Sequence, residues 1–112
     1  MIVNFYNLEH TLEENCHGGE GMVKVARIFE KFTTQMQFFH YTVLPPGSSI
    51  GLHRHGDDEE FYVVLEGNGE MEVDGIKQAV GAGTVIKNEP FGAHGLVNTS
   101  MKEDLRILGC VL

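Results

Sequence analysis

The sequence has no tryptophan, only two cysteines, and no apolar run near the roughly 20 residues that a membrane helix needs. A membrane location is therefore excluded. Cys16 and Cys110 fit neither a disulfide scaffold nor a Cys-x-x-Cys metal clip. Cys110 lies in an apolar tail and is expected to be buried, whereas Cys16 lies in a loop-like stretch without an identifiable partner. The N-terminus lacks the basic and apolar regions of a signal peptide, so a cytoplasmic protein is expected.

Basic residues are also scarce, with 8 Lys and Arg against 16 Asp and Glu and a net charge of −8. A nucleic-acid partner needs a basic surface, so this class of function is excluded. The negative charge does not make the ligand a cation. A bound divalent metal would reverse the local charge in a pocket, and a small anionic partner is therefore predicted.

Glycine, in contrast, is abundant, and its 14 residues fall between short β-branched or aromatic runs. This pattern predicts a single all-β domain, closed as a barrel or jelly roll, with at most a turn or two of helix near Asn7–Asn15. Residues 1–21 are expected to be a segment that packs on a barrel formed by residues 22–112. The expected strands are Met22–Lys31, Gln35–Leu44, Gly51–Arg54, Glu60–Glu66, Gly69–Val73, Ile76–Ala79, Thr84–Lys87, Gly95–Asn98 and Leu105–Leu112.

Two of these strands, Gln35–Leu44 and Glu60–Glu66, are apolar on both faces. A sheet face in contact with water should alternate apolar with polar residues. The second face must therefore be covered, either by the N-terminal segment or by another subunit. We favour the subunit and predict a two-fold homodimer with Phe61, Val63 and Leu65 at its interface.

A cluster of possible metal ligands begins in the third expected strand. His53 and His55 are two residues apart, so their side chains point to the same face. A turn at 56–58 reverses the chain and Glu60 returns on the next strand, while His94 adds a third imidazole behind a later turn. Three imidazoles and a carboxylate form a mixed site that suits Mn, Fe, Co, Ni, Cu or Zn. The alternative is that the histidines decorate a surface loop, but the spacing of four donors favours a site.

These residues resemble the motifs of the cupin superfamily, specifically the small single-domain cupins. The first motif, G-x5-H-x-H-x3,4-E-x6-G, matches Gly47 to Gly67 without a mismatch. The second, G-x5-P-x-G-x2-H-x3-N, is similar to Gly83 to Asn98. This stretch has one residue more before the proline and one fewer before the histidine. The resemblance covers Gln35 to Val111.

The resemblance implies a small jelly-roll barrel that holds one divalent transition metal inside. Mn or Fe is expected first, with Zn, Ni, Co or Cu as alternatives. Carried over by position, the metal ligands are His53, His55, Glu60 and His94. Glu60 is chosen over Glu59 because only Glu60 is separated from Gly67 by the six residues that the motif requires.

The side chains around the metal are predicted from strand alternation. Tyr62, Val64, Leu96 and either Phe39 or Tyr41 are expected to line the pocket. Arg27 alternates with apolar residues and is a candidate for binding a substrate carboxylate, although a surface position is the alternative.

The remaining histidines are not predicted to take part in the site. His40 shares its phase with Phe38 and Thr42, and we expect it on the outer or interface face of its strand. His10 and His17 lie in the N-terminal segment, where a flexible loop is expected.

Four protein ligands leave one or two positions on the metal for water, O2 or a bidentate substrate. We therefore predict a metal-dependent protein acting on a small carboxylate- or hydroxy-carbonyl-bearing molecule, such as oxalate or a short 2-oxo or 2-hydroxy acid. Decarboxylation, isomerisation and dioxygenation all fit. A non-enzymatic binding module is the alternative, and the sequence does not decide whether the protein is an enzyme.

Overall fold

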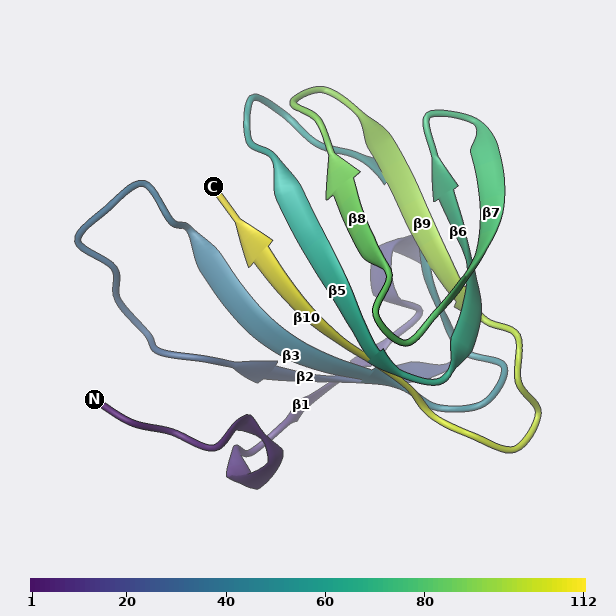
Figure 1. The fold of residues 1–112 in the computed structure, drawn as a ribbon, viewed down its shortest axis with the longest axis horizontal. Helices are drawn as coiled ribbons and strands as arrows, with labels where there is room; N and C mark the ends of the chain where they lie inside the picture. Colours follow the sequence, from purple (N-terminus) through teal and green to yellow (C-terminus); the bar gives the residue numbers. More distant parts are fainter.

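Ten strands and two short 3₁₀ turns form the fold in the computed structural model, which describes residues 1–112 (Figure 1). The chain order is η1 (Phe5–Asn7), β1 (Thr11–Glu14), η2 (Cys16–Gly18), β2 (Met22–Arg27), β3 (Phe38–Leu44), β4 (Ser49–Arg54), β5 (Glu60–Glu66), β6 (Asn68–Val73), β7 (Ile76–Gly81), β8 (Val85–Asn88), β9 (Ala93–Asn98) and β10 (Leu105–Val111). The all-β class predicted from the sequence is confirmed.

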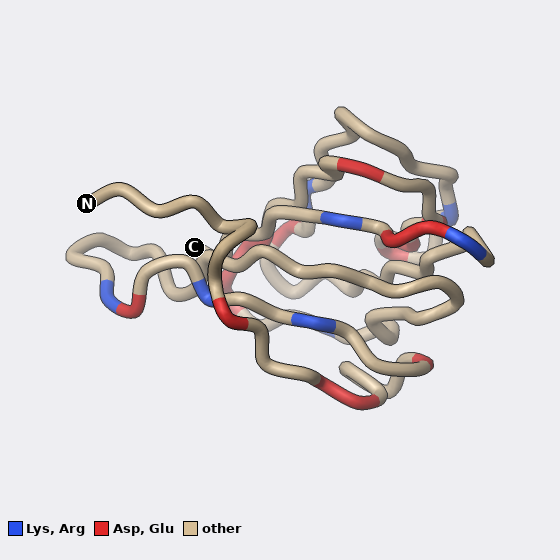
Figure 2. The backbone as a smooth tube through the Cα atoms, turned by 90° about the horizontal axis from the view of Figure 1, so that it is seen from below, with Lys and Arg blue, Asp and Glu red and all other residues tan.

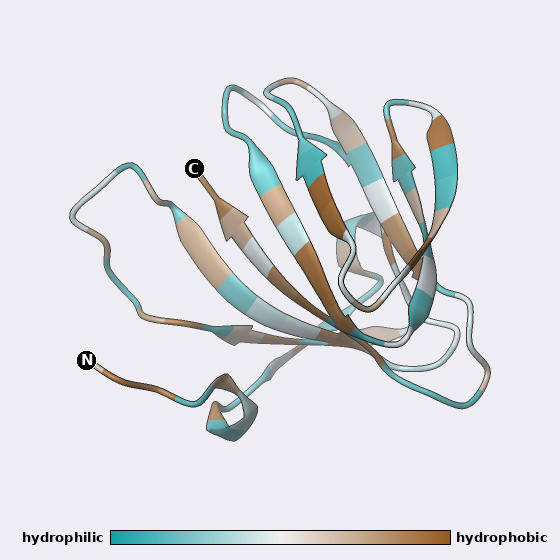
Figure 3. Cartoon of the chain, in the orientation of Figure 1, coloured by the Kyte–Doolittle hydropathy of each residue, from teal (hydrophilic) through white to brown (hydrophobic).

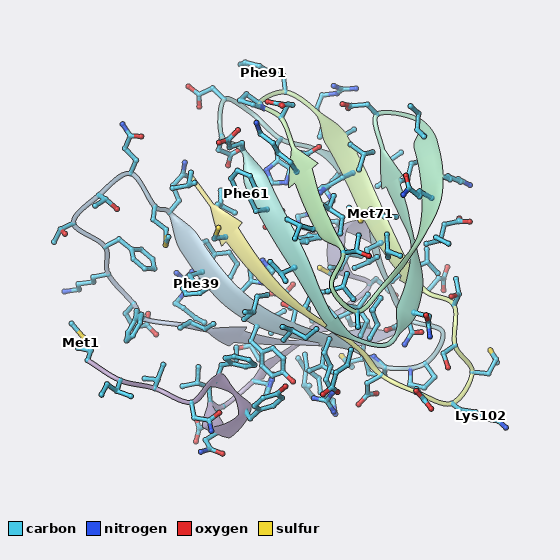
Figure 4. All side chains as sticks on the ribbon, in the orientation of Figure 1. Met1, Phe39, Phe61, Met71, Phe91 and Lys102 are labelled. Carbon is cyan, nitrogen blue, oxygen red and sulfur yellow. The ribbon has the colours of Figure 1, made fainter.

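The strands form two antiparallel sheets that curve around a shared interior (Figure 1). One sheet has the order β1-β2-β3-β10-β5-β8, and the other has the order β4-β9-β6-β7. This is a jelly-roll arrangement, with a core between the inner faces. Met71 on β6 is only 2% exposed and points into that core (Figure 4).

The core is built by the two-residue alternation of the strands. In β5, the inward side chains Glu60, Tyr62 and Val64 are buried, while the residues between them are half-buried or exposed. Figure 3 shows hydrophobic bands along β5, β8, β9 and β10. The buried cluster consists of Val23, Leu44, Ile50, Tyr62, Val64, Met71, Val80, Ile86, Leu96, Leu105 and Ile107.

A second apolar cluster lies on the outer face of the six-stranded sheet, where Ala26, Ile28, Tyr41 and Val43 are buried. The N-terminal segment covers part of it, with the Phe5 ring 4.7 Å from that of Tyr41. Phe61, Val63 and Leu65 face outward and are half-buried.

The N-terminal segment contains more strand and less helix than predicted. The helical content is the two single 3₁₀ turns η1 and η2, and in η1 the Tyr6 N–H donates to the Asn4 side chain. Within the expected helical range, Thr11–Glu14 instead forms β1 and pairs with β2 at the edge of the sheet. Met1 lies at the end of an arm that extends from the body (Figure 4).

The Asp74-Gly75 pair closes the β6–β7 hairpin, where Val73 pairs with Ile76. Both central residues have positive φ, +49° and +84°. This is the backbone that a two-residue type I′ turn requires.

Charged residues are spread over the strands and loops, with acidic and basic positions interspersed along the tube (Figure 2). No helix of the structure is long or apolar enough to cross a bilayer.

Candidate metal centre

The four candidate ligands meet between the two sheets. His53 lies on β4 and His55 directly follows the last residue of that strand, His94 lies opposite His53 on the neighbouring strand β9, and Glu60 comes from β5 in the other sheet. The three Nε2 atoms are 3.0–3.2 Å apart. Glu60 Oε1 lies 3.1 Å from His94 Nε2 and 3.3 Å from His55 Nε2. The donor atoms all lie within 4.8 Å of one another.

These separations fit a metal ion at the centre. Two ligand atoms bound at about 2.1 Å and about 90–110° from one another are roughly 3.0–3.4 Å apart. Three imidazole nitrogens that face one another this closely have too few protons to satisfy all their lone pairs. A cation between them removes this conflict, so the residues fit the metal that the motif predicts.

Hydrogen bonds behind two of the histidines set which nitrogen faces the centre. His53 Nδ1–H donates to the Gly51 carbonyl at 2.7 Å, and His55 Nδ1–H donates to Asp58 Oδ1 at 3.1 Å. Each Nε2 therefore keeps its lone pair free for a metal. His94 Nδ1 is buried without a protein partner. Asp58, in the turn before Glu60, orients a ligand.

The protonation states also suit a metal. Burial, together with the neighbouring histidines, lowers the pKa of His53 to about 4. Burial alone would raise the pKa of Glu60, but hydrogen bonds from His40 and His94 overcome it and lower the pKa to about 2. At neutral pH His53 is uncharged and Glu60 is an anion, as metal ligation requires.

A cavity of about 390 Å³ is lined by three of the four candidate ligands, His53, His55 and Glu60, while His94 is buried behind its wall. Its apolar wall comes from Val25, Phe38, Ile50, Tyr62 and Val111. The structure thus brings Tyr62, which was predicted to contact substrate, into the wall. The Tyr62 ring also stacks on the imidazole of His94 at a centroid distance of 5.0 Å.

The other predicted pocket residues from β3 face away from the cavity. Phe39 and Tyr41 pack in the outer apolar cluster, whereas Phe38, His40 and Thr42 line the cavity. The side chains of β3 that point inward are therefore the ones that were expected to point outward. Because both faces of this strand carry large apolar residues, alternation alone does not show which face points inward.

Val64, Leu96 and Arg27 also lie outside the cavity wall, and Val64 is buried in the core. Leu96 shares its face with His94 but lies two residues deeper, fully buried in the core. The Arg27 guanidinium lies over the Phe38 ring, 4.3 Å from its centroid, and forms an exposed ion pair with Glu30 at 3.9 Å. Arg27 therefore lies at the surface, which was the alternative to a role in binding substrate.

His40 is a site residue that sequence reasoning missed. It was expected on the outer face, but it is 5% exposed and lines the cavity. Its Nε2 lies 3.2 Å from Glu60 Oε2, and its Nδ1 lies 2.7 Å from Thr42 Oγ1. The signal available in the sequence was the pair of polar residues two apart within an apolar strand.

The segment around η2 also borders the cavity, where a flexible loop was expected. Cys16 and His17 both line the cavity wall. The Cys16 thiol donates to Glu13 Oε2 at 3.3 Å. Burial, with Glu13 beside it, raises the pKa of this thiol to about 12, so it is not a ready nucleophile.

Comparison with known proteins gives consistent matches. The model of the family described as a cupin domain matches residues 40–110. An oxalate-binding protein of Thermotoga maritima is 31% identical over all of this chain and 93% of its own length.

Solved structures agree. The crystal structure of a predicted oxalate decarboxylase from Thermotoga maritima is similar with a TM-score of 0.96 and 31% identity, covering 100% of this chain and 98% of that chain. The structure of KdgF from Halomonas sp. shares the fold, with a TM-score of 0.73, 18% identity and coverage of 99% and 93%.

Proposed function

Because the chain belongs to the cupin domain family, we propose that it binds one divalent transition metal and uses it to hold a small anion with adjacent oxygen atoms. The metal ligands in this proposal are His53, His55, Glu60 and His94. The observation that carries it is the convergence of their four donor atoms beside an open cavity that three of the four residues line.

The donor set leaves room for a chelating ligand. Metals that suit three imidazoles and a carboxylate, with Mn or Fe first and Zn, Ni, Co or Cu as alternatives, prefer up to six positions. Four protein donors then leave two. When bound, the metal supplies a positive charge and Lewis acidity to whatever oxygen atoms reach it.

Charge and shape favour a compact anion. A divalent ion beside the single anionic ligand Glu60 leaves a net positive centre, and the cavity wall combines apolar side chains with polar and charged ones. Oxalate, or a short 2-oxo or 2-hydroxy acid, fills two adjacent positions with a five-membered chelate ring. The name of the Thermotoga maritima relative, an oxalate-binding protein, supports the same class of ligand.

Binding is favoured over turnover because most proton-carrying groups near the centre are already engaged. Asp58 is bonded to His55, and His40 is bonded to Glu60. Decarboxylation, isomerisation or dioxygenation is the second candidate. It is favoured by one observation, the Glu13 carboxylate, which lines the same cavity and has the chemistry of a proton donor or acceptor.

The first test is metal content in protein purified without a chelator or an affinity tag. Elemental analysis should give about one metal per chain in the wild type and a large loss in the His53→Ala/His55→Ala variant. An Asp57→Asn variant serves as a control in the same turn region, since Asp57 is not among the clustered donors. Equal metal content in the double variant and the wild type would refute the ligand assignment.

The second test is binding of the anion. Oxalate at about 100 times its Kd should stabilise the metal-bound wild type by roughly 2.7 kcal/mol, read as a thermal shift. Succinate, which cannot form a five-membered chelate, is the matched control and should shift much less. Formation of CO2, or consumption of O2, from the bound acid would identify an enzyme. A shift by oxalate without metal would contradict chelation.

A further inference from the structure

A histidine is buried directly behind one of the proposed metal ligands, and the ligand set itself does not require it. The side chain of His40 on β3 contacts Glu60 on β5 in the same sheet and is only 5% exposed. Burying an imidazole costs free energy unless it is hydrogen-bonded, and both ring nitrogens of His40 have partners. One of these two partners is Glu60, a proposed metal ligand, so His40 can influence how Glu60 binds the metal.

The two oxygens of the Glu60 carboxylate have different partners. In the neutral ring, His40 Nε2–H donates to Oε2 at 3.2 Å, and Nδ1 accepts from the Thr42 hydroxyl at 2.7 Å. The other oxygen, Oε1, points to the cluster, 3.1 Å from His94 Nε2 and 3.3 Å from His55 Nε2. Glu60 thus offers a single oxygen to the metal position.

The place of the His40 ring is fixed by its neighbours. Gly109 on β10 pairs with His40 across the sheet, and a Cβ on Gly109 would collide with the imidazole. The Phe38 ring stacks on the imidazole at a centroid distance of 4.8 Å, and Tyr62 packs edge-on at 6.0 Å. The absence of a side chain at position 109 creates the space that the ring fills.

We propose that His40 is a positioning residue that restricts Glu60 to one metal-bound oxygen and thereby keeps two adjacent coordination positions free for a chelating anion. This inference rests on the proposed function. A carboxylate whose second oxygen is free can turn and bind a metal through both oxygens. In a six-coordinate ion that change leaves one free position, and a five-membered chelate needs two.

The test uses Co²⁺ as the metal probe and oxalate as the anion probe. Wild type, His40→Ala, His40→Gln and Thr42→Val are compared by calorimetry and by the visible absorption of the Co²⁺ complex. His10→Ala is the matched control, because His10 packs against Tyr41 on the outer face of the same sheet. Gln keeps an N–H donor near Oε2, whereas Ala removes it.

We expect His40→Ala to bind one Co²⁺ with an affinity within about 10-fold of wild type, the lower end of the usual effect of a residue behind a ligand. Its visible spectrum should differ from that of wild type before oxalate is added, and its oxalate affinity should fall at least 10-fold. Gln should restore most of both properties. Thr42→Val should shift both in the same direction but less, and it replaces His40→Ala if that variant does not fold.

Two results would overturn the inference. One is a wild-type spectrum and wild-type oxalate affinity in both His40→Ala and Thr42→Val. The other is loss of Co²⁺ itself from the folded variants, which would make His40 a support for metal affinity alone. Failure of the proposed function looks different. Wild type that takes up Co²⁺ but not oxalate refutes the ligand class, while the Co²⁺ spectra still decide the role of His40.

Discussion

The imidazole of His17 lies parallel to that of His53, with ring centroids 3.7 Å apart and planes 10° from parallel. His17 belongs to η2, and its backbone takes the left-handed φ of +50°, which is costly for a residue with a side chain. The segment therefore accepts strain in a conformation that places an aromatic ring against a proposed metal ligand.

This stack predicts an effect of His17 on the metal centre. We expect His17→Ala to weaken metal binding by about 10-fold, because the His53 ring loses the neighbour that fixes its orientation. His17→Phe keeps a flat ring and should bind within a few-fold of wild type. Calorimetric titration with Co²⁺ measures both, and equal affinities in His17→Ala and wild type would show that the stack does not matter.

Acid should destabilise the metal-free protein. The pKa of His53 is about 4 in the folded protein, against 6.5 in the unfolded chain. Between these two pH values the unfolded chain binds a proton that the folded protein does not. Unfolding is then favoured as the pH falls. Glu60, with a folded pKa of about 2 against 4.5, adds a further loss as the pH falls from 4.5 toward 2.

Thermal unfolding of chelator-treated protein at pH 7, 5.5 and 4.5 measures this slope. A His53→Gln variant removes the first titration and should have a shallower slope between pH 6.5 and 4. The same slope in both proteins would contradict the assignment to His53.

The backbone of the N-terminal segment packs directly against the backbone of β4, so a side chain added at this contact should lower the stability of the protein. A Cβ on Gly51 would overlap the carbonyl oxygen of His17. We expect Gly51→Ala to lower the free energy of unfolding by about 1–3 kcal/mol, as for other overpacked sites. Gly56→Ala is the control, because nothing lies within 4 Å of its added Cβ. Denaturant unfolding of both variants gives the comparison.

The homodimer remains a prediction, and the structure suggests where to test it. Val63 pairs with Val85 at the edge of the six-stranded sheet, and Val85 is 64% exposed. Val63→Asp should give monomer or insoluble protein, because it would bury an unpaired charge at the interface. Ile76→Asp, on β7 of the other sheet, should not change the mass. Light scattering that gives 12.4 kDa for the wild type at micromolar concentration would refute the dimer.

The candidate ligands could be found from the sequence because their positions follow from short-range geometry. Residues two apart on a strand share a face, so His53 and His55 had to point the same way. Glu60 follows on the next strand after a short turn. The strand periods and the Asp74-Gly75 turn also located most of β3 to β10.

What the sequence did not reveal depends on contacts between distant residues. The inward face of β3 is selected by packing against β10, where Gly109 leaves room for His40, and the one local sign of it is that the polar residues His40 and Thr42 share a face. Strand β1 has the sequence Thr-Leu-Glu-Glu and is fully exposed, so no apolar pattern marks it. It becomes a strand by pairing with β2.

The pairing of His53 with His94 also determines whether folding or metal binding comes first. These residues are 41 positions apart and meet only when β4 and β9 are joined, while Glu60 arrives from the opposite sheet. An unfolded chain offers a metal little more than the neighbouring His53 and His55. The apolar cluster between the sheets is formed by hydrophobic side chains that pack without a metal. We therefore expect the polypeptide to fold first and to select its ion afterwards, so that metal supply in the cell determines which form is present.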